Sequence, residues 1–302
     1  MARGETDITP YTFEFVAAPD DLKPYLNSLY VFRSEERELE DWLPAYSGQL
    51  LCFLNGGASL DFGSGPRVDT PQFYFMAPLM RARAFTMKGP ALAVGVSLNF
   101  RGWAAFTQLG VDKYHDALLP LEQVVSAHLA AKLRELGPDF RAGRINEKDL
   151  LDALSEIVRE GIKPLSQKHS HFIGVMLEWL SSSFRPELAD LQERLEYSPR
   201  QIQRLAARFF GQSPIHLVRR YRAIRAATLL SMPQLPEVFE DEIRDAFYDQ
   251  AHMIKEIRYF TGRTPTRILP KGSSPVTDML GPDGYGSVDL FGGSEADQLG
   301  ED

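Results

Sequence analysis

The chain has 302 residues, of which 44% are hydrophobic and 25% charged, so it can bury ordinary globular cores and is not disordered as a whole. Its single cysteine, Cys52, excludes an intramolecular disulfide and a cysteine-ligated zinc or iron–sulfur site, and a reducing cytoplasm is the expected location. No apolar run reaches the roughly 18 residues of a membrane span, and residues 1–10 lack the apolar core of a secretory signal. Neither membrane insertion nor export is expected.

Charge is segregated along the chain. The formal net charge is −8, yet residues 166–271 carry 16 Lys and Arg against 12 Asp and Glu. Between Tyr197 and Pro236 there is no Asp, Glu or Lys, and this segment holds seven arginines: Arg200, Arg204, Arg208, Arg219, Arg220, Arg222 and Arg225. Such a segment is typical either of a solvated helix face or of a surface for nucleic acid, so charge alone does not decide between them.

Residues 11–120 predict strands joined by turns. Alternating or apolar runs at Leu50–Leu54, Phe73–Met76 and Leu92–Leu98 are typical of strands. Turn-forming sequences punctuate them: Asn55-Gly56-Gly57, Gly63-Ser64-Gly65-Pro66 and Lys88-Gly89-Pro90. We expect a β-rich sandwich or cupin-like barrel.

The hydrophobic period becomes helical from about Ser126 onward. Asn146 is a candidate N-cap for a helix that Gly161 ends, and a second amphipathic helix contains Ile173, Met176, Leu177, Leu180 and Phe184. Helices are expected to continue to about Ile268. After Pro270 the chain is rich in Gly, Ser, Pro and Asp, which predicts a flexible acidic tail.

The basic half contains an internal repeat with an offset of 51 residues. The repeat pairs several landmarks: Tyr197-Ser198 with Tyr248-Asp249, Ile202 with Met253, Arg204 with Lys255, Phe209 with Phe260, Gly211 with Gly262, and Ser213-Pro214 with Thr264-Pro265. Ser198 and Asp249 are N-cap residue types, and each glycine fits the left-handed position that ends a helix. Proline after Ser213 and Thr264 then suits the first position of a new helix.

Shorter helices are predicted upstream of each cap, at Leu188–Leu195 and Val238–Ala246. Each copy therefore has the helix-turn-helix pattern, and the helix opened by Ser213-Pro214 is long enough to act as a rigid spacer. Two recognition helices fit successive turns of the DNA major groove, which are about 34 Å apart.

These residues resemble the AraC/XylS family of bacterial transcription regulators. The strongest match joins residues 247–253 (FYDQAHM) to residues 258–265 (RYFTGRTP), and residues 200–214 are similar to the family's first helix-turn-helix. Residues 95–103 and 118–122 resemble the β-rich regulatory domain of one subgroup. The resemblance implies a two-part fold: residues 1–125 form a β-rich sensor domain, 126–168 a helical linker suited to dimerisation, 169–270 a double helix-turn-helix and 271–302 the tail.

The resemblance implies that the exposed faces of the two recognition helices contact DNA. Residues expected to contact bases are Arg200, Gln203, Arg204, Gln250, Ala251, His252 and Lys255, because Arg suits guanine and Gln suits adenine in the major groove. Residues expected to contact phosphates are Ser198, Arg208, Arg219, Arg220 and Arg258. The inward face of the first recognition helix would carry Ile202, Leu205, Ala206 and Phe209.

The sequence departs from the family pattern in the second unit. Ala246 stands where the family usually has a turn glycine, which would cost about 1 kcal/mol if the backbone there is left-handed. Glu240, Asp241 and Glu242 place three acids where small or apolar residues are the rule. The second unit is therefore expected to pack differently or to bind DNA weakly.

Other site types have little support. His169 and His171 lack a third ligand, so no metal or cofactor is expected, and no nucleotide-binding or catalytic motif occurs. An effector pocket containing Arg81, Arg83, Trp103 and the run Phe73–Phe75 is outweighed by an ordinary core with surface arginines.

We therefore expect a DNA-binding transcription regulator, not an enzyme, with double-stranded DNA as partner. An unidentified small effector, RNA polymerase and a second copy of the chain are candidate further partners. Two alternatives remain open: a β-barrel enzyme with a helical interaction module, and a regulator that acts mainly through protein partners.

Overall fold

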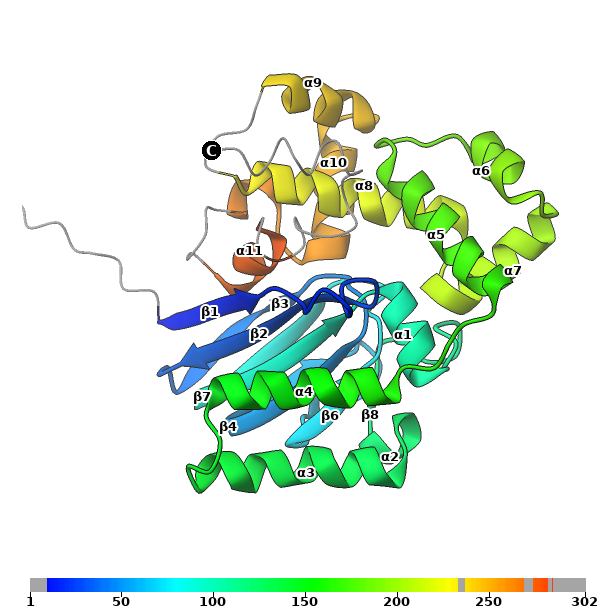
Figure 1. The fold of residues 1–302 in the computed structure, drawn as a ribbon. Coiled ribbons are helices and arrows are strands. Elements are labelled where there is room, and N and C mark those ends of the chain that lie inside the picture. The colour runs from blue at the N-terminus through cyan, green and yellow to red at the C-terminus, as the bar shows by residue number, and fades with distance from the viewer. Residues whose placement is uncertain (1–9, 233–236, 269–273, 282–283, 285–302) are drawn as a thin grey trace, which may run out of the picture.

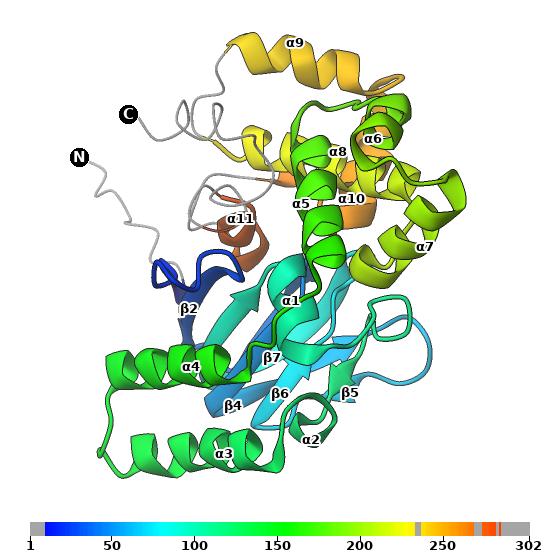
Figure 2. The same ribbon diagram turned by 45° about the vertical axis from the view of Figure 1, so that its right-hand side comes forward.

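The computed structural model describes residues 10–232, 237–268, 274–281 and 284. The N-terminal part of this chain forms an antiparallel sheet, and most of the remainder is helical (Figures 1 and 2). The architecture is therefore α+β, with the β-rich part first, as the sequence predicts. The boundaries at residues 125, 168 and 270 remain a prediction.

The sheet has eight strands in the described residues, and its main path runs β1-β2-β7-β4-β6-β8. The strands are β1 (Tyr11–Val16), β2 (Leu26–Ser34), β3 (Glu38–Leu43), β4 (Gln49–Asp61), β5 (Val68–Asp69), β6 (Phe73–Met76), β7 (Arg83–Leu98) and β8 (Leu118–Leu119). One half of the long strand β7 pairs with β2 and the other half with β3, while β4 pairs along the length of β7. This arrangement brings β2 and β3 to the same side of β7.

Two turns expected from the sequence are wrong. Strands β4 and β7 continue through residues 55–57 and 88–90, and their pairing shifts register around Asn55. Gly56 has a φ of 70°, and a Cβ atom there would lie 2.5 Å from the Lys88 carbonyl oxygen. The turn-forming residues therefore make an irregularity inside a bent strand pair and do not reverse the chain.

Side chains alternate between the two faces of the sheet, since successive residues of a strand point in opposite directions. Leu29 and Val31 of β2 pack in one core together with helices α3 and α4. The intervening Tyr30 points into a cavity on the opposite face, which Phe32 also lines. Figure 1 shows α3 and α4 along one face of the sheet and α8, α10 and α11 beyond the other.

The helices agree closely with the sequence landmarks. They are α1 (Phe100–Thr107), α2 (Leu121–Val124), α3 (Ala127–Arg141), α4 (Glu147–Gly161), α5 (Gln167–Ser181), α6 (Leu188–Leu195), α7 (Pro199–Phe210), α8 (Pro214–Leu230), α9 (Glu237–Ala246), α10 (Gln250–Thr261) and α11 (Pro275–Leu280), with a 3₁₀ turn η1 at Pro265–Arg267. Asn146, Ser198 and Asp249 each accept an amide hydrogen at a helix start, so these predicted caps are confirmed. None of the helices described is long and apolar enough to cross a membrane.

The expectation of a flexible tail from residue 271 is wrong for α11. Val276 and Leu280 are fully buried in the same core as the helices α5 to α10. Their spacing of four residues places them on one side of a short helix. The surrounding Gly, Ser and Asp make this apolar pair hard to recognise in the sequence. Residues 271–273, 282–283 and 285–302 of the expected tail lie outside the described residues.

Candidate nucleic-acid interface

Helix α7 exposes a row of polar side chains that have no partner in the described structure. Its opposite face is buried through Ile202, Leu205, Ala206 and Phe209, as expected. Arg200, Gln203 and Arg204 are exposed and make no hydrogen bond or ion pair with any described residue. Long polar side chains left free on a rigid helix are available to a partner outside the chain.

The start of α7 is fixed by a capping box. The Ser198 hydroxyl oxygen accepts from the Gln201 amide at 3.3 Å, and the Gln201 side chain accepts from the Ser198 amide at 3.0 Å. These bonds satisfy two backbone donors that the helix itself cannot pair, and they set the direction in which α7 leaves the turn. Ser198 is exposed at this helix start, where anions are favoured.

His169 of α5 lies in the positive electrostatic field of the α7 arginines. Its ring lies edge-on to Phe209, with the centroids 5.0 Å apart. Burial, and then repulsion from Arg208 and Arg204, lower the pKa of His169 below its ordinary value. The two arginines therefore act together on one small region of the surface.

The C-terminal end of α7 rests on the β-rich part of the chain. The Val111 amide donates to the Arg208 carbonyl at 2.7 Å. Gly211, with a φ of 77°, ends the helix so close to Met80 and Val111 that a Cβ atom would clash with both. Helix α7 is thus anchored at one end and free along its polar face.

Helix α8 corrects two of the expected phosphate contacts. Arg220 is 2% exposed, donates to the Ala45 carbonyl at 3.1 Å and stacks over Phe100, so it does not reach the surface. Arg219 is half-exposed, but its Nε donates to Glu256 Oε1 at 2.7 Å. Both arginines connect α8 to other elements, and we remove them from the candidate DNA surface.

The Glu256 carboxylate of α10 is the centre of this pairing. Arg222 also donates to it, with its Nε 3.1 Å from Oε2. Burial would raise the pKa of Glu256, but the hydrogen bonds from Arg219 and Arg222 outweigh it and hold that pKa below its ordinary value. His252, an expected base contact, lies 3.3 Å from the same carboxylate and is only half-exposed.

The outer face of α10 is turned toward the sheet. Ala251, Lys255 and Arg258 line an open cleft whose other side contains Trp42 and Arg81. Backbone hydrogen bonds hold the helix end in place: the Ala45 amide donates to the Phe260 carbonyl at 2.7 Å and the Ala82 amide to the Tyr259 carbonyl at 3.1 Å. Among the expected base contacts of this unit, Gln250 is exposed outside the cleft.

The two departures from the family pattern cause no strain in the second unit. Ala246 is the last residue of α9 and does not have a left-handed backbone, whereas Glu196 does at the end of α6, with a φ of 51°. Glu240, Asp241 and Glu242 are exposed, while Phe239 and Ile243 form the buried face of α9. The expected cost of about 1 kcal/mol at Ala246 therefore does not arise.

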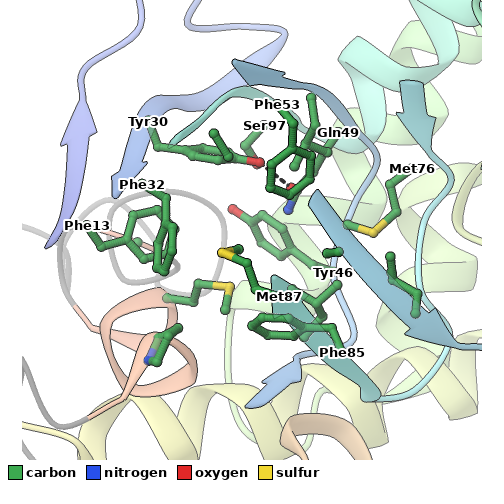
Figure 3. Close-up of a pocket in the computed structure, with 18 of the residues that line it drawn as sticks. Phe13, Tyr30, Phe32, Tyr46, Gln49, Phe53, Met76, Phe85, Met87 and Ser97 are labelled. Atoms are coloured by element: carbon green, nitrogen blue, oxygen red, sulfur yellow. Dashed lines mark hydrogen bonds between the residues drawn. The ribbon is translucent and has the colours of Figure 1, made fainter. Parts of the chain in front are cut away.

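A cavity of about 80 Å³ lies against the face of the sheet that is turned away from α3 and α4. Figure 3 shows Phe13 and Phe32 at one side of it, and Phe85 and Met87 at another. The polar groups in its wall include Tyr30, which donates to Gln49 Oε1 at 2.7 Å. Burial, followed by the neighbouring Tyr74 and Tyr46, raises the pKa of Tyr30 well above its ordinary value.

The C-terminal segment closes this cavity. Pro275, Met279 and Gly284 belong to its lining. Helix α11 is held by the Tyr11 hydroxyl, which donates to Asp278 Oδ2 at 2.9 Å, and by the Val276 amide, which donates to Asp41 Oδ2 at 3.0 Å. Asp41 is buried and also accepts from Arg263 Nη2 at 2.6 Å, directly after α10.

Of the residues considered for an effector pocket in the sequence, only Tyr74, inside the run Phe73–Phe75, lines this cavity. Trp103, Phe73 and Phe75 belong instead to the core on the helix-covered face. Arg83 is buried in an ion pair with Asp116 at 2.9 Å, and Arg81 is exposed at the cleft beside α10. Strict alternation along the strands would have separated these two sets of side chains.

No metal site is formed by the described residues, in which no group of three or more His, Cys, Asp or Glu side chains is placed to hold an ion.

No protein-family model matches the chain, and no curated protein matches it either. Three solved structures are similar to it. Two are structures of ToxT from Vibrio cholerae, at 11% and 10% identity, each with a TM-score of 0.43, covering 79% and 85% of this chain and 96% of ToxT.

The third is the AraC-like transcriptional activator CuxR, at 13% identity and a TM-score of 0.30, covering 72% of this chain and 87% of CuxR. At these identities and TM-scores no residue role or activity is carried over from the three structures.

Proposed function

We propose that the protein is a sequence-specific transcription regulator that reads double-stranded DNA with α7. The observation that carries this proposal is the free polar row Arg200, Gln203 and Arg204 on a capped helix whose other face is buried. A helix of this kind fits the major groove, where a bidentate Arg contact with guanine discriminates by about 1–3 kcal/mol. Arg208, exposed at the end of the same helix, is placed to meet a phosphate.

The experiment compares three variants that each remove one positive charge. Arg204→Ala should weaken binding to the preferred duplex by about 1–3 kcal/mol and relax the preference at one base pair, because it removes a base contact. Arg208→Ala should weaken all duplexes alike and reduce the salt slope by about one.

The matched control is Arg134→Ala, because Arg134 is exposed on α3 and pairs with Glu122, away from α7. This variant should bind DNA like the unaltered protein. Equal behaviour of the Arg204 and Arg208 variants across all sequences would contradict the assigned roles.

The second recognition helix is proposed to engage DNA only after it leaves the sheet. Its Ala251, Lys255 and Arg258 line the cleft opposite Trp42 and Arg81, so a duplex that approaches them also meets the sheet side while the Phe260 and Tyr259 carbonyls remain bonded to it. The released protein would present both recognition helices, and the dimer expected through residues 126–168 would add a second pair.

An apolar effector is proposed to control this release through the cavity. The cavity of about 80 Å³ is roughly half of the 150 Å³ that admits benzene in an engineered protein. A ligand of the size of benzene or larger therefore needs more space than the cavity offers. It would gain this space by displacing α11, which forms part of the cavity wall. Displacement of α11 would withdraw Val276 from Asp41 and weaken the hold of Asp41 on Arg263. A ligand that binds the displaced arrangement better would thereby favour release of α10.

A further inference from the structure

The cleft between α10 and the sheet is a site separate from the apolar cavity. It has a volume of about 610 Å³, opens to solvent and shares no lining residue with the cavity. One wall comes from the sheet side, with Trp42, Asp61 and Arg81, and the other from α10, with Lys255 and Arg258. A molecule bound there would touch both parts of the protein.

The cleft has an excess of unpaired positive charge. Arg81, Lys255 and Arg258 are all exposed, and none of their side chains makes an ion pair or hydrogen bond with a described residue. The single acid in the lining is Asp61, whose Oδ1 accepts from the Gly63 amide at 2.7 Å. The excess charge favours an anion with more than one negative charge.

Two guanidinium groups converge at one side of the cleft. A Cβ atom built on Gly63 would lie 2.6 Å from Arg81 Nη2 and 3.0 Å from Arg83 Nη1, so both groups border this glycine. Arg83 is neutralised by Asp116 at 2.9 Å, but Arg81 has no such counter-ion among the residues that the structure describes. A phosphate group would supply one, because Arg binds phosphate oxygens through paired N–H donors.

Two aromatic side chains complete the site. Trp42 and Tyr259 are 36% and 47% exposed, and both line the cleft. Trp42 packs against Gly262, and Tyr259 lies edge-on to Phe260 with the ring centroids 4.8 Å apart. Exposed aromatic rings next to cations suit a ligand that joins a flat ring to a phosphate.

We propose that this cleft binds an aromatic organic phosphate of the mononucleotide class. The phosphate meets Arg81, Lys255 and Arg258, and the base lies against Trp42 or Tyr259. Because the ligand joins α10 to the sheet, it holds α10 in the docked arrangement. That last consequence rests on the proposed DNA-binding function, whereas the binding itself does not.

The test is isothermal titration calorimetry of the full chain with AMP. Adenosine and inorganic phosphate, which each contain one part of AMP, are titrated for comparison. We expect AMP to bind at least about tenfold tighter than either, because only AMP engages both the cations and the rings. AMP binding no tighter than that of inorganic phosphate would overturn the proposal, as would the absence of AMP binding.

Arg81→Ala locates the site. It should weaken AMP binding by about tenfold or more, which corresponds to the loss of a charge-assisted hydrogen bond. Arg134→Ala, on the distant helix α3, should leave AMP binding unchanged. Unaltered AMP affinity in a folded Arg81→Ala protein, checked by thermal unfolding, would show that AMP binds elsewhere and would overturn the assignment.

DNA binding by the same Arg81 variant separates this proposal from the proposed function. Arg81 is not one of the proposed DNA contacts, so the variant should bind DNA as the unaltered protein does in the absence of AMP. A protein that binds AMP in this way but no DNA would contradict the regulator proposal alone.

Discussion

Arginines that look equivalent in the sequence have three different roles in the structure. Arg204 is exposed on α7 without a partner among the described residues, Arg219 is paired with Glu256, and Arg220 is buried beneath the Ala45 carbonyl. The inward face of α7 could be predicted because its apolar residues recur at helical spacing. Helix α8 is buried on almost all sides, so its pattern gives no indication of which arginines reach solvent.

His169 provides a direct probe of the α7 surface. Burial and the charges of Arg208 and Arg204 lower its pKa, so phosphates placed beside these arginines should raise it again. We expect the pKa of His169, followed by NMR of its ring protons during a pH titration, to rise when DNA is added. The rise should persist in Arg134→Ala and disappear when Arg204 and Arg208 are both replaced by Ala; a rise that survives the double substitution would contradict the assigned surface.

The same histidine makes stability depend on pH. The His169 ring binds a proton less tightly in the folded protein than in the unfolded chain, where the pKa of histidine is near 6.5. Its contribution to the free energy of unfolding should therefore be present above that pH and decline as the pH falls below it.

At the scale of elements, local signals predicted helix ends better than strand ends. The caps at Ser198 and Asp249 and the left-handed Gly211 and Gly262 depend on side chains a few residues away, so the sequence contains what determines them. The bend near Gly56 depends instead on pairing between β4 and β7, which are distant in the chain. Turn-forming residues therefore predicted a reversal that does not occur.

Helix α11 shows how distant contacts organise a segment that composition misrepresents. Asp41 accepts from both Arg263 and the Val276 amide, so it joins α11 to the end of α10. Asp41→Asn keeps the size of the side chain but removes its charge, and should lower the free energy of unfolding by about 2–4 kcal/mol. Hydrogen exchange should become faster in Pro275–Leu280 and in Gln250–Thr261.

The matched control for this prediction is Asp152→Asn, which removes the same charge from the exposed pair of Asp152 with Lys148 on α4. An exposed pair contributes about 0–1 kcal/mol, so stability and exchange in α11 should stay close to those of the unaltered protein. If α11 remained equally protected in the Asp41 variant, Asp41 would not be the connection between the two helices.

At the scale of the whole molecule, the two helix-turn-helix units are docked on the β-rich part at equivalent places in the repeat. Gly211 abuts Met80 and Val111, and Gly262 abuts Trp42. Helix α7 nevertheless keeps its polar face free, whereas α10 has its outer face in the cleft. Figure 2 shows α7 at the outside of the helical part. The repeat could be predicted from the sequence, but this asymmetry depends on packing against the sheet.

The central claim is that α7 reads base sequence in duplex DNA. Selection of bound duplexes from a random pool, at a fixed salt concentration of about 150 mM, tests it most directly because non-specific binding is weakened at that ionic strength. The account predicts enrichment of a defined motif by the unaltered protein, with one base pair of that motif degenerate when Arg204→Ala is used. A pool that emerges from selection without any sequence preference would contradict it.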